Sequence, residues 1–480
     1  MKSKRINANK QFIGREFELS KLAQIADTNE ASIVVVYGRR RVGKTELVEQ
    51  AFRNRNIIKF EGVEGEHKFS QMKHVLSQFS EYAGDPLIAK LNLRSWAEIF
   101  QLIAKYTLKG EWTLFLDELQ WLASYRSQLI AELKYVWDNY FRQNRSLVLV
   151  LCGSSPSFII NKVLHSRALY NRSQHEIHLQ EFDLHETKSF LGSRRSNREV
   201  MDAYLTVGGI PEYLKYLNRE SSVFLGLCKN TFVSGSFFSN EYQRIFTSRL
   251  GSNRDYLKVI RFLSRERFAA RQEIAKHIKC ETGGTLTALL KDLELCGFIT
   301  RYVPYNLDEQ SLLTRYGISD QYLQFYFKFI EPVYGEIQNG SFNKNPALPI
   351  NTDTYLKWLG YSFERLCRKR HRLIAKLLGF ESVIYKAGAF FNRQSHTQDK
   401  GFQIDLVFDR SDRVITICEI KYLQSKATRR IIADFERKLE LFPNPKKATI
   451  NKVLITTEGA DNELTSYFDR ILTLDDIFLA

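Results

Sequence analysis

The chain has 480 residues, of which 44% are hydrophobic and 26% charged, and this balance excludes collagen-like, disordered and disulfide-scaffold proteins. Lysine and arginine number 70 against 54 aspartates and glutamates, a formal net charge of +16 that favours anionic partners such as nucleic acid. No apolar run approaches the roughly 20 residues of a membrane-spanning helix, and the basic N-terminus lacks the apolar core of a secretory signal. We therefore expect a soluble cytoplasmic protein of about three domains that does not bind membranes.

A glycine-bounded loop follows the first predicted strand. Residues 32–37 (SIVVVY) are typical of a strand buried on both faces, and the residues from Thr45 onward have helical apolar spacing. Between them, GRRRVGKT has the GxxxxGK[ST] pattern in the strand–loop–helix context of a phosphate site, where backbone amides and the start of the helix face an anion. Lys44 would approach the terminal phosphates and Thr45 would ligate Mg²⁺. The residues expected to contact the nucleotide are Gly38, Arg39, Arg40, Arg41, Val42, Gly43, Lys44 and Thr45.

Two further strands are predicted to end in polar side chains. Residues 112–118 (WTLFLDE) end in Asp117, which would hold Mg²⁺, and Glu118, which would act as general base on the attacking water. The alternative is an ordinary strand end followed by a solvated acidic turn. The third strand, residues 146–155, has Ser154 and Ser155 at its polar end, and one of them, Ser154 or Ser155, could sense the γ-phosphate if this strand lies between the other two. A serine-rich turn explains the same residues equally well.

Six motifs of the first 215 residues together resemble the archaeal-type ATPase family, a branch of the AAA+ and STAND nucleotide switches. The resemblance implies ATP as ligand, a three-layer P-loop α/β core over residues 1–183 and a helical lid over residues 184–250. It places Gly209–Pro211 near the nucleotide. Arg172 would stabilise charge on the transferred phosphate or pair locally at the surface. The motifs are FIGREFEL (12–19), VVVYGRRRVGKTEL (34–47), LFLDELQWL (114–122), the GSS strand end (153–155), LYNRS (169–173) and GGIPEYL (208–214).

The middle segment, residues 251–334, predicts a winged helix-turn-helix domain. Three successive helical patterns, the first beginning at Asp255, are followed by a β-hairpin, and an aromatic helix occupies residues 319–334. The third helix carries few side chains that could reach base edges, so the domain either reads DNA or mediates packing and partner contact. Residues 335–352 are rich in Asn, Gly and Pro, which is typical of a linker.

The last segment, residues 353–480, predicts a helix, three strands, a helix and a strand. Asp405 ends FQID in the second strand, and Glu419 and Lys421 form EIK in the third. Residues i and i+2 of a strand share a face, and a meander would place Asp405 beside them. Two carboxylates so placed can hold Mg²⁺ or Mn²⁺, which would polarise a phosphodiester while Lys421 orients a water. Glu364, on the preceding helix, could add a ligand or base.

This constellation resembles the PD-(D/E)xK nuclease superfamily, with its restriction-endonuclease-like α/β fold, although Ile404 stands where the superfamily motif has proline. The sequence as a whole therefore predicts an ATP-hydrolysing switch that controls a metal-dependent nuclease. Its substrate would be DNA rather than RNA, and the chain could form a homo-oligomer. The alternative is a non-cleaving DNA-binding or partner-sensing ATPase, because an acid and a lysine two residues apart also form plain charge pairs in sheets.

Overall fold

The computed structural model describes residues 9, 12–123, 128–165, 173–247, 255–266, 268–281, 283–302, 305, 314–392 and 401–479. It divides into two compact units. The first comprises Met1–Phe182, Ile210–Glu212 and Lys291–Gly297, and the second comprises the rest of the chain. The predicted division into five segments stays a prediction. Across the described helices, none combines the length and the apolar character that crossing a bilayer requires.

The first unit is built on a five-stranded sheet in the order β2-β3-β4-β1-β5, in which all neighbours are parallel. Strands β1, β3 and β4 are buried along their whole length, as their continuous apolar runs predict. Strand β4 lies between β3 and β1, which is the condition set above for Ser154. The strands are β1 (Ser32–Tyr37), β2 (Asn56–Glu61), β3 (Trp112–Asp117), β4 (Leu147–Gly153) and β5 (Ser173–His178).

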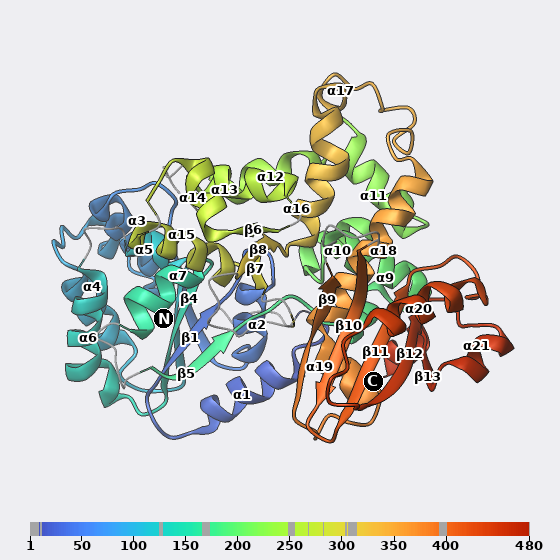
Figure 1. The fold of residues 1–480 in the computed structure, drawn as a ribbon. Coiled ribbons are helices and arrows are strands. Elements are labelled where there is room, and N and C mark those ends of the chain that lie inside the picture. Colours follow the sequence, from blue (N-terminus) through green and yellow to red (C-terminus); the bar gives the residue numbers. More distant parts are fainter. Residues whose placement is uncertain are drawn as a thin grey trace. The chain divides into compact units, whose positions relative to one another are not determined.

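Helices cover both faces of this sheet, so the unit has the three layers expected (Figure 1). Alternate residues of β1 enter different cores: Ile33 packs with α3, α4 and α6, whereas Val34 packs with α1 and α2. The helices are α1 (Glu16–Asp27), α2 (Lys44–Ala51), α3 (Lys68–Ala83), α4 (Trp96–Tyr106), α5 (Leu119–Leu122), α6 (Leu129–Asn139) and α7 (Pro156–Phe158), with shorter turns at Ile88–Lys90, Phe141–Gln143 and Ile159–Leu164.

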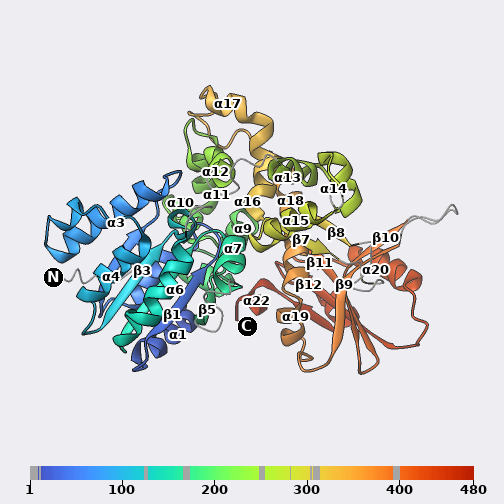
Figure 2. The same cartoon turned by 90° about the vertical axis from the view of Figure 1, so that its left-hand side faces the viewer.

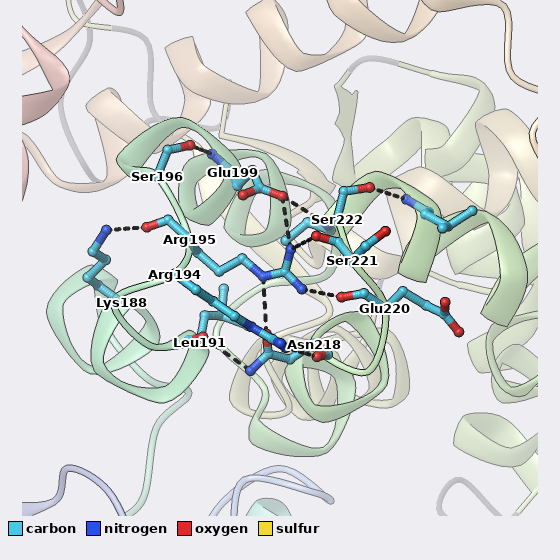
Figure 3. Close-up of polar contacts among 12 residues, drawn as sticks. Lys188, Leu191, Arg194, Arg195, Ser196, Glu199, Asn218, Glu220, Ser221 and Ser222 are labelled. Atoms are coloured by element: carbon cyan, nitrogen blue, oxygen red, sulfur yellow. Dashed lines mark hydrogen bonds and ion pairs between the residues drawn. The ribbon is translucent and has the colours of Figure 1, made fainter.

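Five described helices follow the first sheet along the chain, and all of them except the start of α10 belong to the second unit. A buried arginine, Arg195, joins the turn before α9 to the connection between α10 and α11 (Figure 3). Its guanidinium donates to the carbonyls of Glu220 (2.6 Å) and Ser221 (2.8 Å) and to Glu199 Oε1 (3.2 Å). The helices are α8 (Leu184–Leu191), α9 (Asn197–Val207), α10 (Pro211–Leu217), α11 (Val223–Phe232) and α12 (Phe237–Thr247).

The middle segment forms three helices and a small antiparallel sheet in the order β6-β8-β7. The aromatic segment that follows is helical but changes its winding along its length, and its last helix extends into the segment expected to be a linker. The elements are α13 (Asp255–Arg265), β6 (Ala269–Ala270), α14 (Arg271–Ile278), α15 (Gly284–Leu295), β7 (Ile299–Tyr302), β8 (Arg315–Ile318), α16 (Gln321–Phe325), a π-helix (Tyr326–Ile330), a 3₁₀ turn (Glu331–Val333) and α17 (Tyr334–Gln338).

The last segment contains a five-stranded sheet in the order β13-β12-β11-β10-β9, seen from a second direction in Figure 2. The expected meander is present, because β10 pairs antiparallel with both β9 and β11, whereas β11 and β12 are parallel. The expected long helix is two helices, since Arg370 leaves helical geometry (φ −99°, ψ 27°). The elements are α18 (Thr352–Lys369), α19 (His371–Leu377), β9 (Tyr385–Asn392), β10 (Phe402–Arg410), β11 (Val414–Lys421), α20 (Arg430–Leu441), β12 (Thr449–Thr456), α21 (Asn462–Tyr467), β13 (Arg470–Leu472) and α22 (Leu474–Leu479).

Candidate nucleotide site and candidate metal site

The loop between β1 and α2 has the backbone that the glycine pattern predicts. Gly38 has φ 157°, and a Cβ there would lie 2.2 Å from the carbonyl oxygen of Leu179, so no other residue fits without a shift. Gly43 caps α2 with φ 89°. Arg15 supports the loop from behind by donating to the carbonyls of Val42 (3.2 Å) and Gln180 (2.7 Å). The side chain of Val42 is buried in the core, so only its backbone can face a ligand.

Two cations and a hydroxyl meet the acidic end of β3. Lys44 is 6% exposed, and its Nζ donates to the carbonyl of Arg39 at 3.0 Å. Thr45 Oγ1 donates to Asp117 Oδ2 at 2.8 Å, so the two expected Mg²⁺ ligands lie together. Lys59 of β2 was not predicted, yet its Nζ lies 3.5 Å from Asp117 Oδ2 and 3.2 Å from Glu49 Oε1. A lysine in the otherwise apolar run of β2 was the sequence signal that could have identified it.

Glu118 has the geometry and the charge of a general base. Its backbone is left-handed (φ 48°), a conformation that costs a non-glycine residue about 1 kcal/mol and that recurs at functional sites. Ser154 Oγ donates to Glu118 Oε2 at 2.7 Å, and Gln120 Nε2 donates to the same oxygen. Burial raises the pKa of Glu118, but the charge of Lys44 and these two hydrogen bonds outweigh it and lower the pKa overall. The carboxylate is therefore ionised at neutral pH.

These residues suit a magnesium nucleotide. The hydroxyl of Thr45 and the carboxylate of Asp117 offer the hard oxygen ligands that Mg²⁺ prefers. The loop contributes the backbone of Gly38–Gly43 and the ammonium group of Lys44 for the phosphates. Arg172, the predicted charge-stabilising arginine, lies outside the described residues. The roles assigned to the loop arginines and to Ser154 stay predictions.

The second candidate site lies where β10 and β11 run side by side. Leu406 pairs with Cys418, so the adjoining residues Asp405 and Glu419 face one another across the two strands. Asp405 is 6% exposed and Glu419 is 1% exposed. The backbone amide of Ile420 donates to Asp405 Oδ2 at 3.0 Å. The meander thus brings together the carboxylates that the sequence predicts to be neighbours.

Two lysines contact the carboxylate of Glu419, and an arginine lies beside the backbone of Asp405. Lys421 Nζ lies 2.6 Å from Glu419 Oε1, and Lys438 Nζ of α20 lies 2.9 Å from both oxygens of Glu419. Arg368 Nη1 lies 3.5 Å from Glu364 Oε2 and donates to the carbonyl of Asp405 at 3.2 Å. Lys438 was not predicted. Its position three residues after the core residue Phe435, on the buried face of α20, was the available signal.

The electrostatics of Asp405 differ from those of Glu419. Burial, followed by the charges of Glu419 and Glu364, raises the pKa of Asp405 to about 6. A cation beside Asp405 would relieve this repulsion, so Asp405 fits a divalent ion. Glu419, in contrast, already faces two ammonium groups. The described residues contain no group of three or more histidine, cysteine, aspartate or glutamate side chains arranged for a metal. A site with Glu364 as third ligand is therefore not assembled here, and two carboxylates remain candidates.

Comparisons with known proteins cover different shares of the chain. Residues 12–217 match the family described as ATPase domain predominantly from Archaea. An uncharacterised protein of Methanocaldococcus jannaschii is 27% identical over 439 residues, which cover 90% of this chain and 92% of that protein.

Two solved structures are similar at low identity. A Walker-type ATPase of Pyrococcus abyssi (17% identity, TM-score 0.49) covers 67% of this chain and 97% of its own. The ORC2 protein of Aeropyrum pernix (14% identity, TM-score 0.46) covers 70% of this chain and 97% of its own. Residues 12–217 are thus similar to the archaeal-type ATPase domain, and the described loop Gly38–Gly43 has the backbone of a phosphate loop.

Proposed function

We propose that the chain binds and hydrolyses ATP and that this reaction controls a metal-dependent nuclease site in its last domain. The observation that carries the first half is the contact between Thr45 and Asp117 with the ionised Glu118 next to it. Mg²⁺, when bound, would neutralise charge on the phosphates. Lys44 would hold the terminal phosphates, and Glu118 would accept a proton from the attacking water. The hydrogen bond from Ser154 would orient the base.

Hydrolysis measured on two variants tests this half. Glu118→Gln keeps the size of the base but cannot take a proton, so we expect ATP binding to persist and hydrolysis to fall by about 10²- to 10⁴-fold. Glu64→Gln, at an exposed glutamate of the same unit, is the matched control and should hydrolyse ATP normally. Wild-type turnover by Glu118→Gln would remove Glu118 from the mechanism.

The second half rests on Glu419 and Lys421 at the end of β11 and on Asp405 of β10, which accepts from the amide of Ile420 between them. A Mg²⁺ or Mn²⁺ ion held by the two carboxylates would polarise a phosphodiester of DNA. Lys421, 34% exposed at its side chain, can reach a water or a phosphate oxygen, whereas Lys438 is buried and would hold Glu419 in place. Nicking of supercoiled plasmid by the full chain, with Mg²⁺ or Mn²⁺, tests this site. We expect Asp405→Asn and Lys421→Ala to abolish nicking, and normal nicking by both would refute the assignment.

A second candidate function is a regulatory ATPase that binds DNA or a partner without cutting. Two observations favour it. Lys421 and Lys438 already neutralise Glu419, and Tyr302 of β7 donates its hydroxyl to the carbonyl of Ala389 on β9 at 3.1 Å. The helices and sheet of the middle segment support a winged helix. The contact between Tyr302 and Ala389 uses strand β7 of that domain for packing against β9. Salt-dependent DNA binding without nicking under either metal would establish the second candidate.

A further inference from the structure

Helix α9 contacts α18, which carries Glu364, and the residues that directly follow β11, which carries Glu419 and Lys421. It packs against α18, which bears Glu364, and the two helices lie near one another in Figures 1 and 2. Thr206 Oγ1 of α9 and Tyr355 Oη of α18 are 2.8 Å apart. Just beyond α18, Arg370 donates to the hydroxyl of Tyr204 at 3.1 Å. Helix α9 belongs to the part of the chain that matches the ATPase family.

The polar face of α9 also holds the residue that follows Lys421. The hydroxyl of Tyr422 donates to Asp202 Oδ1, and the guanidinium of Arg198 lies over the Tyr422 ring at 4.0 Å. Arg198 Nη1 then donates to the carbonyl of Leu423 (2.5 Å) and to Glu458 Oε1 (3.0 Å). The ring, the hydroxyl and the next carbonyl each contact α9, so the end of β11 is coupled to the position of α9.

The contacts at the two ends of α9 explain why its interaction with Tyr422 could respond to nucleotide. At its start, Glu199 is fixed by Arg195 and accepts from the amide of Val223 at 3.0 Å, which ties α9 to α11 (Figure 3). At its end, Gly208 (φ 74°) leads directly into Ile210–Glu212, which belongs to the first unit. There, Glu212 Oε1 lies 3.9 Å from Arg41 Nη1 of the phosphate loop. Two residues of chain, Gly208 and Gly209, separate α9 from a segment in contact with that loop.

We propose that Arg198 and Asp202 are positioning residues for the candidate nuclease site, and that α9 transmits the state of the phosphate loop to β11 through Tyr422. The inference rests on the proposed function. A shift of α9 either carries Tyr422 with it and so displaces Lys421, or breaks the hydroxyl bond and loosens the end of β11. If α9 has two positions in equilibrium, nucleotide can shift that equilibrium only by binding one of them more tightly than the other.

Hydrogen exchange of the full chain tests the inference without relying on cleavage. Peptides covering residues 414–425 are followed without nucleotide, with ADP, and with a non-hydrolysable ATP analogue, each with Mg²⁺. We expect the nucleotides to change exchange in this segment of the wild type. Tyr422→Phe should speed exchange there about fivefold without nucleotide, the effect of one ordinary hydrogen bond, and should weaken the nucleotide response, since the contacts of Arg198 with the ring and with Leu423 remain. Asp202→Ala should do the same, whereas Asp202→Asn retains an acceptor oxygen and should largely restore wild-type behaviour.

The control is Asp255→Asn, which removes a carboxylate from an exposed helical pair with Lys258 (2.8 Å) and should leave residues 414–425 unchanged. Nucleotide affinity is measured on the same samples. If the wild type binds nucleotide but this segment does not respond, or if Tyr422→Phe behaves as wild type, the inference is overturned while the ATPase proposal stands. If no nucleotide binds, the ATPase proposal fails, and exchange of Tyr422→Phe without nucleotide still decides whether α9 positions β11.

Discussion

Replacing Lys438 by methionine probes the buried charges around Glu419 most sharply. Lys438 is 8% exposed and Glu419 is 1% exposed, and the lysine donates at 2.9 Å to both carboxylate oxygens and lies 3.1 Å from Asp434 Oδ2. Removing one partner of a buried ion pair typically costs about 3–5 kcal/mol. Lys421 still pairs with Glu419 at 2.6 Å. We therefore expect Lys438→Met to lower the local stability by about 2–3 kcal/mol.

The assay is hydrogen exchange of β11 and α20 at neutral pH, because a chain of two units need not unfold in one step. A loss of about 2–3 kcal/mol speeds exchange about 30- to 150-fold where local opening controls it. The double variant Lys438→Met with Glu419→Gln removes the stranded charge and should recover part of the loss. Burial lowers the pKa of Lys438, but Glu419 and Asp434 outweigh it and raise the pKa overall, so this stabilisation is lost only as pH rises through that raised value. Exchange in Lys438→Met within threefold of wild type would refute this reasoning.

Three further predictions follow from the same contacts. The pKa of Asp405 is raised to about 6, so the fold favours the protonated form of this carboxyl group. Asp405→Asn should therefore stabilise the metal-free protein by about 2 kcal/mol at pH 7 but hardly at pH 4, as measured by thermal unfolding. Equal effects at both pH values would contradict this expectation. Arg195→Met should destabilise the α9–α11 region by about 3 kcal/mol in hydrogen exchange, whereas the exposed neighbour Arg194→Met should cost less than about 1 kcal/mol. In Thr45→Val, the gain in nucleotide affinity that Mg²⁺ provides should fall about tenfold in titration calorimetry, whereas Thr45→Ser should keep it. An unchanged gain in Thr45→Val would remove the hydroxyl from the metal site.

Short-range patterns explain what the sequence could predict. The phosphate loop depends on the adjacent β1, Gly38, Gly43 and α2, so its backbone follows from contiguous residues. The neighbouring positions of Asp405 and Glu419 follow from a simple meander, because antiparallel strands joined by a tight turn leave little choice of register.

The features that the sequence did not predict depend on packing between distant segments. Lys59, Arg195 and Lys438 find their partners on other elements, and nothing in their local sequence specifies those partners. Strand β13 has three residues, too few for an alternating pattern. The break at Arg370 accompanies a hydrogen bond to Tyr204 of α9, a contact 166 residues away.

The central claim is that the loop from Gly38 to Thr45 binds the phosphates of a nucleotide, and titration calorimetry of the full chain with ATP and Mg²⁺ tests it most directly. We expect saturable binding by the wild type, and loss of that binding in Lys44→Ala with the fold intact by circular dichroism. Absence of binding by the wild type, or equal binding by Lys44→Ala, would contradict the account.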